Sequence, residues 1–223
     1  MAIDLEQLRD LPPVSEQEIA NIKNRFETQA PPFTAEPDYL AVLAFGGTIQ
    51  SAYVPADENI KPIPMNPVLE RTTELGEKFG IAGKFITGSI LIAKDSREVV
   101  NADIANLIYT IQQIPNRKIV VTCGTYMLPI IAQALDMHFA DGKSDKIIGV
   151  TGSWLPQATA GQDVDYNSGA VIAAVNAFDM AKQKGIVFAQ FHGEIIAGAD
   201  LAKLNLHPPG VSPRLARPLV ITR

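Results

Sequence analysis

The stretch that decides the fold is Leu43-Ala44-Phe45-Gly46-Gly47-Thr48-Ile49-Gln50-Ser51. It ends an apolar run, residues 39–44, that is too short for a typical helix and is followed by two glycines, which predicts a buried strand and a tight turn. In open α/β sheets, ligands bind beyond the carboxyl ends of the strands, and paired glycines let backbone N–H groups approach a substrate closely. Thr48 is therefore the first candidate for chemistry, and an ordinary turn threonine is the alternative.

Further apolar runs alternate with helical patterns along the rest of the chain. They predict strands over residues 85–93, 118–122, 146–151 and 186–191, and helices over 67–79, 101–114, a stretch ending at 137, and 168–184. Asn101 is expected to cap the second of these helices. Nearly continuous apolar strands that alternate with helices are typical of a parallel sheet covered on both faces. The predicted class is α/β: a doubly wound, flavodoxin-like, mostly parallel sheet with helices on both faces.

The flavodoxin-like strand order 2-1-3-4-5 makes the first and third strands neighbours at the point where the winding reverses. The loops after these two strands carry Thr48 and Thr125, so both threonines are expected to face one cleft. Ser96, after the second strand, would line the same cleft. Asp163, after the fourth, would lie at its edge or support the loop.

Residues 1–38 are predicted to form a helical extension, separate from a domain over residues 39–223. Two proline pairs bracket its helix, which opens with the capping-box pattern Ser15-x-x-Glu18. We expect this helix to serve packing or an oligomer contact. The polar, proline-dotted segment 51–66 is predicted to be a loop long enough to act as a substrate lid.

Composition excludes several classes of function. The 223 residues are 47% hydrophobic with a net charge of -5, which permits one large domain or two small ones and gives no basic footprint for nucleic acid or an anionic membrane. No apolar run is long enough to span a bilayer and no signal peptide opens the chain, which predicts a cytoplasmic protein. One cysteine and three scattered histidines predict neither a disulfide nor a metal site, and no cofactor is expected.

Two arrangements compete for nucleophilic chemistry. A threonine hydroxyl needs a base, and Lys203, beyond the last strand, is the candidate; a solvated surface lysine is the alternative. Cys123 with a histidine is the rival pair, but a thiol at the end of an apolar strand favours a buried, inert role. Gly46 and Gly47 lack the spacing of a phosphate-binding glycine motif, which argues against nucleotide binding. Trp154 is expected either to pack over the site or to fill a subunit contact.

Five blocks in order make residues 39–205 resemble the N-terminal domain of the bacterial-type L-asparaginase and glutaminase family. Ala44-Phe45-Gly46-Gly47-Thr48-Ile49 is similar to the family's Thr-Gly-Gly-Thr-Ile signature, and Asp95-Ser96 to its substrate-carboxylate clamp. Residues 121–126 occupy the place of the second signature, Thr-His-Gly-Thr-Asp-Thr. Residues 152–156, followed by Asp163 and Asn167, resemble the family's Gly-Ala-Met-Arg-Pro segment and its downstream aspartate and asparagine. Residues 194–203 resemble the segment that carries the catalytic lysine.

The resemblance implies an amidohydrolase that releases ammonia from the side-chain amide of asparagine or a related small molecule. It implies three catalytic residues, with Thr48 as the nucleophile assisted by Thr125 and Lys203. The substrate-binding residues that it implies are Asp95, Ser96, Gly47, Gly124, Tyr126 and Tyr53.

Four departures accompany these matches. Tyr126 replaces an aspartate that holds the substrate amino group, and Cys123 replaces a histidine. The first loop lacks the aligned catalytic tyrosine, which leaves Tyr53 as a substitute. The sequence also ends near Arg223 without the smaller C-terminal domain, so we expect a homo-oligomer, most simply a two-fold dimer. The alternative to an enzyme is a non-catalytic module that binds an amino acid or small ligand.

Overall fold

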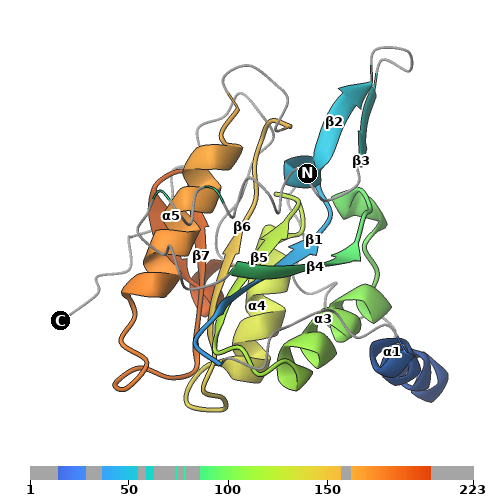
Figure 1. The fold of residues 1–223 in the computed structure, drawn as a ribbon. Helices are drawn as coiled ribbons and strands as arrows, with labels where there is room; N and C mark the ends of the chain where they lie inside the picture. Colours follow the sequence, from blue (N-terminus) through green and yellow to red (C-terminus); the bar gives the residue numbers. More distant parts are fainter. Residues whose placement is uncertain are drawn as a thin grey trace.

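A six-stranded sheet forms the centre of the computed structural model, which describes residues 15–28, 37–54, 59–62, 74, 78, 86–156 and 162–201. Across the sheet the strands are β4 (Ile86–Ile92), β1 (Leu40–Phe45), β5 (Lys118–Cys123), β6 (Ile147–Thr151), β7 (Ile186–Phe191) and β8 (Glu194–Ala197). The first five are parallel, and β8 pairs antiparallel with β7 (Figure 1). The predicted order 2-1-3-4-5 is confirmed, with β8 added at one edge.

Helices cover both faces of this sheet. Helices α3 (Asn101–Gln113) and α4 (Leu128–Phe139) pack on one face, and α5 (Val164–Ala177) packs on the other (Figure 1). Successive strand residues point to opposite faces. Leu43 accordingly belongs to the core beneath α3 and α4, and Val42 to the core beneath α5. Both are fully buried, and burial of each such side chain stabilises the fold by about 1.5 to 3 kcal/mol.

Helix α1 (Glu16–Thr28) begins with the predicted capping box. The Ser15 N–H donates to the Glu18 carboxylate at 2.8 Å, and the Glu18 N–H donates to Ser15 Oγ at 3.3 Å. The bond from the Ser15 N–H and a second bond from the Ser15 hydroxyl, at 2.7 Å, lower the pKa of the Glu18 carboxyl. The bond from the Glu18 N–H satisfies a donor that an uncapped helix leaves without a partner. The helix contacts α3, on the α3–α4 side of the sheet (Figure 1).

The segment predicted to be a loop over residues 51–66 contains a β-hairpin instead. Strands β2 (Ser51–Val54) and β3 (Asn59–Pro62) pair antiparallel and project beyond the end of β1, at the top of Figure 1. The prediction was wrong because each strand has only four residues, too few for a clear alternation of polar and apolar side chains. The predicted helix over 67–79 lies outside the described residues, apart from Glu74 and Lys78.

Two helix starts differ from their predictions. Val100, not Asn101, precedes α3, and the Asp103 carboxylate accepts the Val100 N–H at 3.0 Å. Helix α5 begins at Val164 rather than at 168, because Gln162 Oε1 accepts the Asp165 N–H at 3.1 Å and satisfies a donor of the first turn. It ends at residue 177 rather than 184.

Residues 178–184 form a turn rather than the predicted end of α5. The Asp179 side chain accepts the Ala181 N–H at 3.0 Å, and the Asp179 carbonyl accepts the Lys182 N–H at the same distance. The backbone bond from Ala181, and after it the Lys182 ammonium 3.3 Å from the carboxylate, lower the pKa of Asp179. In the part of the chain that the structure describes, no helix is long and apolar enough to cross a membrane.

Candidate functional site

The candidate site begins where β1 and β5 leave the sheet together. Phe45 pairs with Cys123 in the last register position of both strands, so the glycines that follow, Gly46 and Gly124, emerge side by side. Thr48 opens a short 3-10 helix, η2 (Thr48–Gln50), directly after the β1 turn. This is the reversal point of the sheet, where α/β folds bind their ligands.

Hydrogen bonds to neighbouring groups fix the turn before Thr48. The Gly47 N–H donates to the Lys94 carbonyl after β4 at 2.9 Å, and the Gly46 N–H donates to Gln50 Oε1 at the same distance. Ser51 Oγ donates to the Gly47 carbonyl at 2.8 Å. Lys94 is itself held by an ion pair with Asp103 at 2.9 Å. The turn is therefore pre-organised before any ligand binds.

The loops after three strands meet at Gly47. A Cβ added to Gly47 would lie only 2.1 Å from Gly124 Cα and N, and a Cβ added to Gly124 would lie 2.4 Å from Ser96 Cβ. Real Cβ atoms do not approach other heavy atoms this closely, so any larger residue at either position would force the backbone or Ser96 to shift. Of the predicted site residues, the structure brings Gly47, Ser96 and Gly124 into direct contact, with Thr48 and Thr125 next in sequence to the glycines.

Replacing Gly47 with alanine is expected to lower the free energy of unfolding by at least about 3 kcal/mol, measured by urea denaturation. Gly47 has φ 83° and ψ -176°, a region almost restricted to glycine, and its added Cβ would also meet the Gly124 backbone. Gly142→Ala is the matched control: its φ is 75°, but nothing lies within 4 Å of the added Cβ. The control is expected to lose only about 1 to 2 kcal/mol. Equal losses for the two variants would contradict the close contact of the loops.

Asp95 and Ser96, the predicted carboxylate clamp, have different surroundings. Both oxygens of the Asp95 carboxylate accept from the Arg97 guanidinium at 3.0 Å, and the Arg97 N–H donates to it at 2.8 Å. The guanidinium hydrogen bond holds the pKa of Asp95 below its usual range. Ser96 opens the 3-10 helix η5 (Ser96–Glu98) against Gly124. The sequence reasoning missed Arg97, although its position two residues after an aspartate was the available signal.

The last residue of β5 and the residues that follow it differ in exposure. Cys123 is fully buried, and desolvation raises the pKa of its thiol, which agrees with the inert role favoured for it. Thr125 is partly buried, and a Cβ added to Gly152 would lie 3.5 Å from its Cγ2. Tyr126 is 49% exposed at the start of the loop. The loops after β5 and β6 are therefore in contact beside Thr125.

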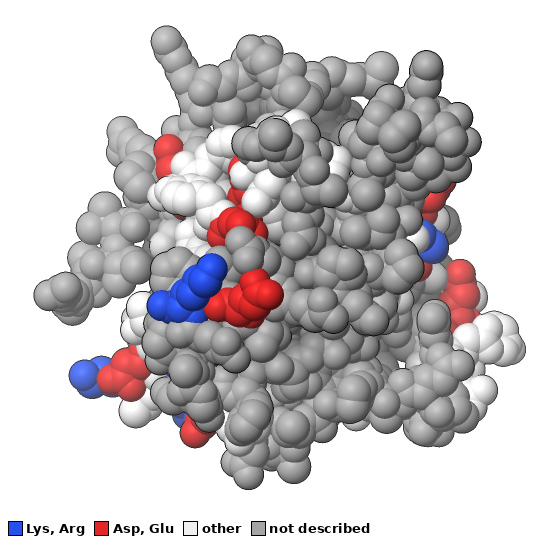
Figure 2. Space-filling model, turned by 45° about the horizontal axis from the view of Figure 1, so that its top comes forward, with Lys and Arg blue, Asp and Glu red and all other residues white. Residues whose placement is uncertain are grey.

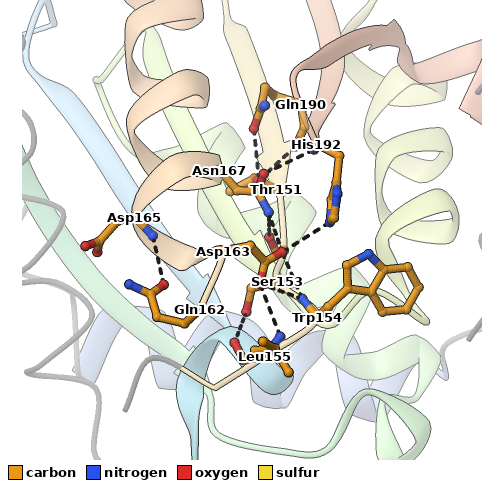
Figure 3. Close-up of polar contacts among 11 residues, drawn as sticks. Thr151, Ser153, Trp154, Leu155, Gln162, Asp163, Asp165, Asn167, Gln190 and His192 are labelled. Carbon is orange, nitrogen blue, oxygen red and sulfur yellow. Dashed lines mark hydrogen bonds and ion pairs between the residues drawn. The ribbon is translucent and has the colours of Figure 1, made fainter. Parts of the chain in front are cut away.

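Asp163 supports the loop after β6, as predicted. Its carboxylate accepts the backbone N–H groups of Trp154 at 3.1 Å and Leu155 at 3.2 Å, and the Asn167 amide at 2.9 Å (Figure 3). Asn167 also donates to the Gly152 carbonyl at 3.0 Å. Two side chains at the start of α5 thus hold both ends of the 152–155 segment.

His192 is a second residue that the sequence reasoning did not assign to the site. It follows β7, and its Nε2 lies 3.3 Å from Asp163 Oδ2 (Figure 3). Trp154 packs edge-on against Phe191 and His192, with ring centroids 5.5 and 6.3 Å apart. These contacts place the Trp154 ring against the turn after β7, and its two predicted roles, over the site or in a subunit contact, stay predictions.

Two predicted site residues cannot be placed by their side chains. Lys203 lies outside the described residues, as does the side chain of Tyr53, whose backbone pairs with Ile60 in the hairpin. Among the residues that are described, no cluster of His, Cys, Asp or Glu could hold a metal ion. On the face shown in Figure 2, the described Lys and Arg side chains lie beside acidic ones and form no broad basic patch.

The fold defines a doubly wound α/β protein, and the hydroxyl-bearing glycine turn at its reversal point is the candidate ligand site at the carboxyl edge of the sheet. Residues 39–208 match the model of the asparaginase N-terminal domain, and the chain belongs to the asparaginase family. No curated protein sequence matches the chain.

Solved structures similar to this chain include two described as L-asparaginases. A thermostable L-asparaginase from Thermococcus kodakarensis is 22% identical with a TM-score of 0.56, and the match covers 72% of this chain and 46% of that one. A probable cytoplasmic L-asparaginase from Campylobacter jejuni is 17% identical with a TM-score of 0.55, covering 72% and 48%. At these identities the similarity shows the fold. The chain spans about half the length of both.

Proposed function

We propose that the protein is an asparaginase-like amidohydrolase with Thr48 as its nucleophile. The observation that carries the proposal is the contact of Gly47, Gly124 and Ser96, which gathers three strand-end loops around the Thr48 turn. Thr48 attacks the carbon of a side-chain amide to give an acyl-enzyme and ammonia, and water then hydrolyses the ester. Membership of the asparaginase family and the structural neighbours support this class of reaction.

The fold restricts which groups can assist this reaction. The N–H groups of Gly46 and Gly47 already donate to Gln50 and Lys94, so we assign the oxyanion to the N–H groups of Thr48 and Thr125. Thr125 and Lys203 would transfer the proton from the Thr48 hydroxyl. Ser96, at the η5 start, would hold the substrate carboxylate. Asp95 would act indirectly, since Arg97 occupies both of its oxygens.

A non-catalytic module is the second candidate, and Tyr126 is the observation that favours it. A half-exposed tyrosine stands where the family signature has the aspartate that holds the substrate amino group. Such a module would keep the Thr48 turn and Ser96 and bind an amino acid without hydrolysing it. It would then be a binding protein built on an enzyme fold.

Ammonia release from a panel of amides separates the two candidates. The panel includes L-asparagine, L-glutamine, N-acetyl-L-asparagine and a short peptide with an internal asparagine. Turnover that requires the Thr48 hydroxyl is the result expected of the enzyme. Saturable binding of aspartate or asparagine by calorimetry, with no turnover of any amide, would favour the module and contradict the enzyme.

We also propose that the protein is a homo-oligomer, most simply a two-fold dimer. Tyr126, Leu155 and Tyr166 are exposed by 49%, 38% and 61%, and all three lie at the carboxyl edge of the sheet. Large apolar side chains gathered on one edge are typical of an interface, and the second copy of a two-fold dimer presents the same surface. Light scattering at micromolar concentration is expected to give twice the chain mass, and a monomer would refute the prediction.

A further inference from the structure

The Asp163 carboxylate is a point where three parts of the chain meet. It accepts hydrogen bonds from the loop after β6 and from Asn167 in α5, and Nε2 of His192, in the β7–β8 turn, lies 3.3 Å from its Oδ2 (Figure 3). The side chain is only 18% exposed. Hydrogen bonds to a largely desolvated carboxylate are stronger than those between neutral groups, so the position of Asp163 determines the position of the loop.

His192 is held in an uncommon backbone conformation beside this carboxylate. Its φ is 49°, in the left-handed region that few residues other than glycine adopt. Its backbone N–H donates to Asn167 Oδ1 at 3.1 Å, which fixes the turn independently of the ring. The ring packs against both Phe191, with centroids 4.4 Å apart, and Trp154, with centroids 6.3 Å apart. The surrounding contacts thus direct Nε2 at Asp163.

The loop held by Asp163 continues to the candidate site. Gly152 begins this loop, and a Cβ added to it would lie 2.7 Å from the Cys123 carbonyl and 3.5 Å from Thr125 Cγ2. No side chain can stand between the two loops at this point. A shift of the 152–155 segment would therefore be transmitted directly to the turn that carries Thr125.

We propose that His192 is a positioning residue: through Asp163 it fixes the loop after β6 against the turn that carries Thr125. His192 itself touches no reacting atom. Its effect on catalysis rests on the proposed function, whereas its effect on the loop does not. The ring nitrogen lies against Asp163 Oδ2, the oxygen that also accepts from the Trp154 N–H and the Asn167 amide, so its loss leaves the carboxylate and the loop free to move together.

The test uses the full-length protein and two readouts. Trp154 is the only tryptophan in the chain, so intrinsic fluorescence and its quenching by acrylamide report on this loop alone. His192→Leu keeps apolar contact with Trp154 but removes the ring donor, and His192→Gly removes the ring while suiting the positive φ. His192→Gln restores a donor near the position of Nε2. His138→Leu, on the exposed surface of α4, is the matched control.

Both His192→Leu and His192→Gly are expected to increase the acrylamide quenching of Trp154. They are also expected to lower kcat on the most active amide by about ten- to a hundred-fold with a smaller change in KM, because small displacements of positioned groups have effects of this order. His192→Gln should return both readouts towards wild type, and His138→Leu should change neither. The glycine variant keeps the test available if the leucine variant does not fold.

Wild-type quenching in the leucine and glycine variants would overturn the proposal. So would increased quenching that leaves kcat unchanged, or a defect that glutamine does not restore. If the wild-type protein hydrolyses no amide, the proposed function fails, and the quenching readout alone then decides whether His192 positions the loop.

Discussion

Replacing Thr48 with valine is expected to lower kcat/KM on the most active amide by at least about a thousand-fold, the order of loss seen when a catalytic nucleophile is removed. Valine keeps the shape and β-branching of threonine and removes only the hydroxyl. Thr48 is half-buried at the start of η2, and the turn before it is held by bonds to Lys94 and Gln50 that do not involve its side chain. The fold should therefore survive while the reaction is lost.

Two controls make this result specific to the hydroxyl. Thr48→Ser retains the oxygen and is expected to keep activity within about ten-fold of wild type. Thr110→Val makes the same chemical change at a buried position of α3 and should leave kcat/KM unchanged. Ammonia release measures activity, and thermal melting confirms folding. Equal activity of the valine and serine variants would show that the Thr48 hydroxyl is not the nucleophile.

The architecture around Thr48 was predictable because it depends on short-range patterns. The apolar runs that form β1, β4, β5, β6 and β7 are interrupted by turn residues, and each is too short for a helix. A strand buried on both faces needs apolar side chains on each face, as Leu43 and Val42 show in β1. The strand order then places the β1 and β5 turns together.

The contacts within the site were less predictable because they join residues far apart in the sequence. Asp163 was assigned to the loop from its place after a strand, but its partner His192 has no local pattern that points to it. Glycine was expected at position 47 because it lets the backbone N–H groups approach a substrate closely. The structure adds a steric reason, the backbone of Gly124, which only the strand register reveals.

The hairpin β2–β3 was missed for a different physical reason. Its strands have four residues each and include Pro62, which cannot donate a backbone hydrogen bond. Pairing between Ser51 and Pro62 at one end and Val54 and Asn59 at the other stabilises the segment through contacts, not intrinsic propensity. The extended conformation of such short strands depends on pairing with the neighbouring strand.

The last prediction concerns Tyr126 and the choice of substrate. A carboxylate that faces an amino-acid ammonium makes a charge-assisted hydrogen bond, and losing one in a desolvated site costs about 2 to 5 kcal/mol. A phenol carries no carboxylate to replace that charge, and its ring is larger than the aspartate side chain that it replaces. Asp95, the acid after the neighbouring strand, is no substitute because its two oxygens are engaged by Arg97.

Free L-asparagine is therefore expected to be a poor substrate, and an amide without a free α-amine, such as N-acetyl-L-asparagine, is expected to do relatively better. At about 1.4 kcal/mol per factor of ten, the loss corresponds to about thirty-fold to several thousand-fold in kcat/KM for asparagine. Tyr126→Asp should recover much of this loss for asparagine and little for the acetylated analogue. Tyr126 is 49% exposed, so the fold should tolerate its replacement.

Tyr126→Asn isolates the charge, because asparagine and aspartate have nearly the same size and shape. A gain for L-asparagine in the aspartate variant only would show that the missing charge limits this substrate. An equal gain in both variants would show that the tyrosine ring blocks the ammonium by its volume. Efficient hydrolysis of free L-asparagine by the unmodified protein, measured by ammonia release, would contradict the assignment of Tyr126 to the ammonium position.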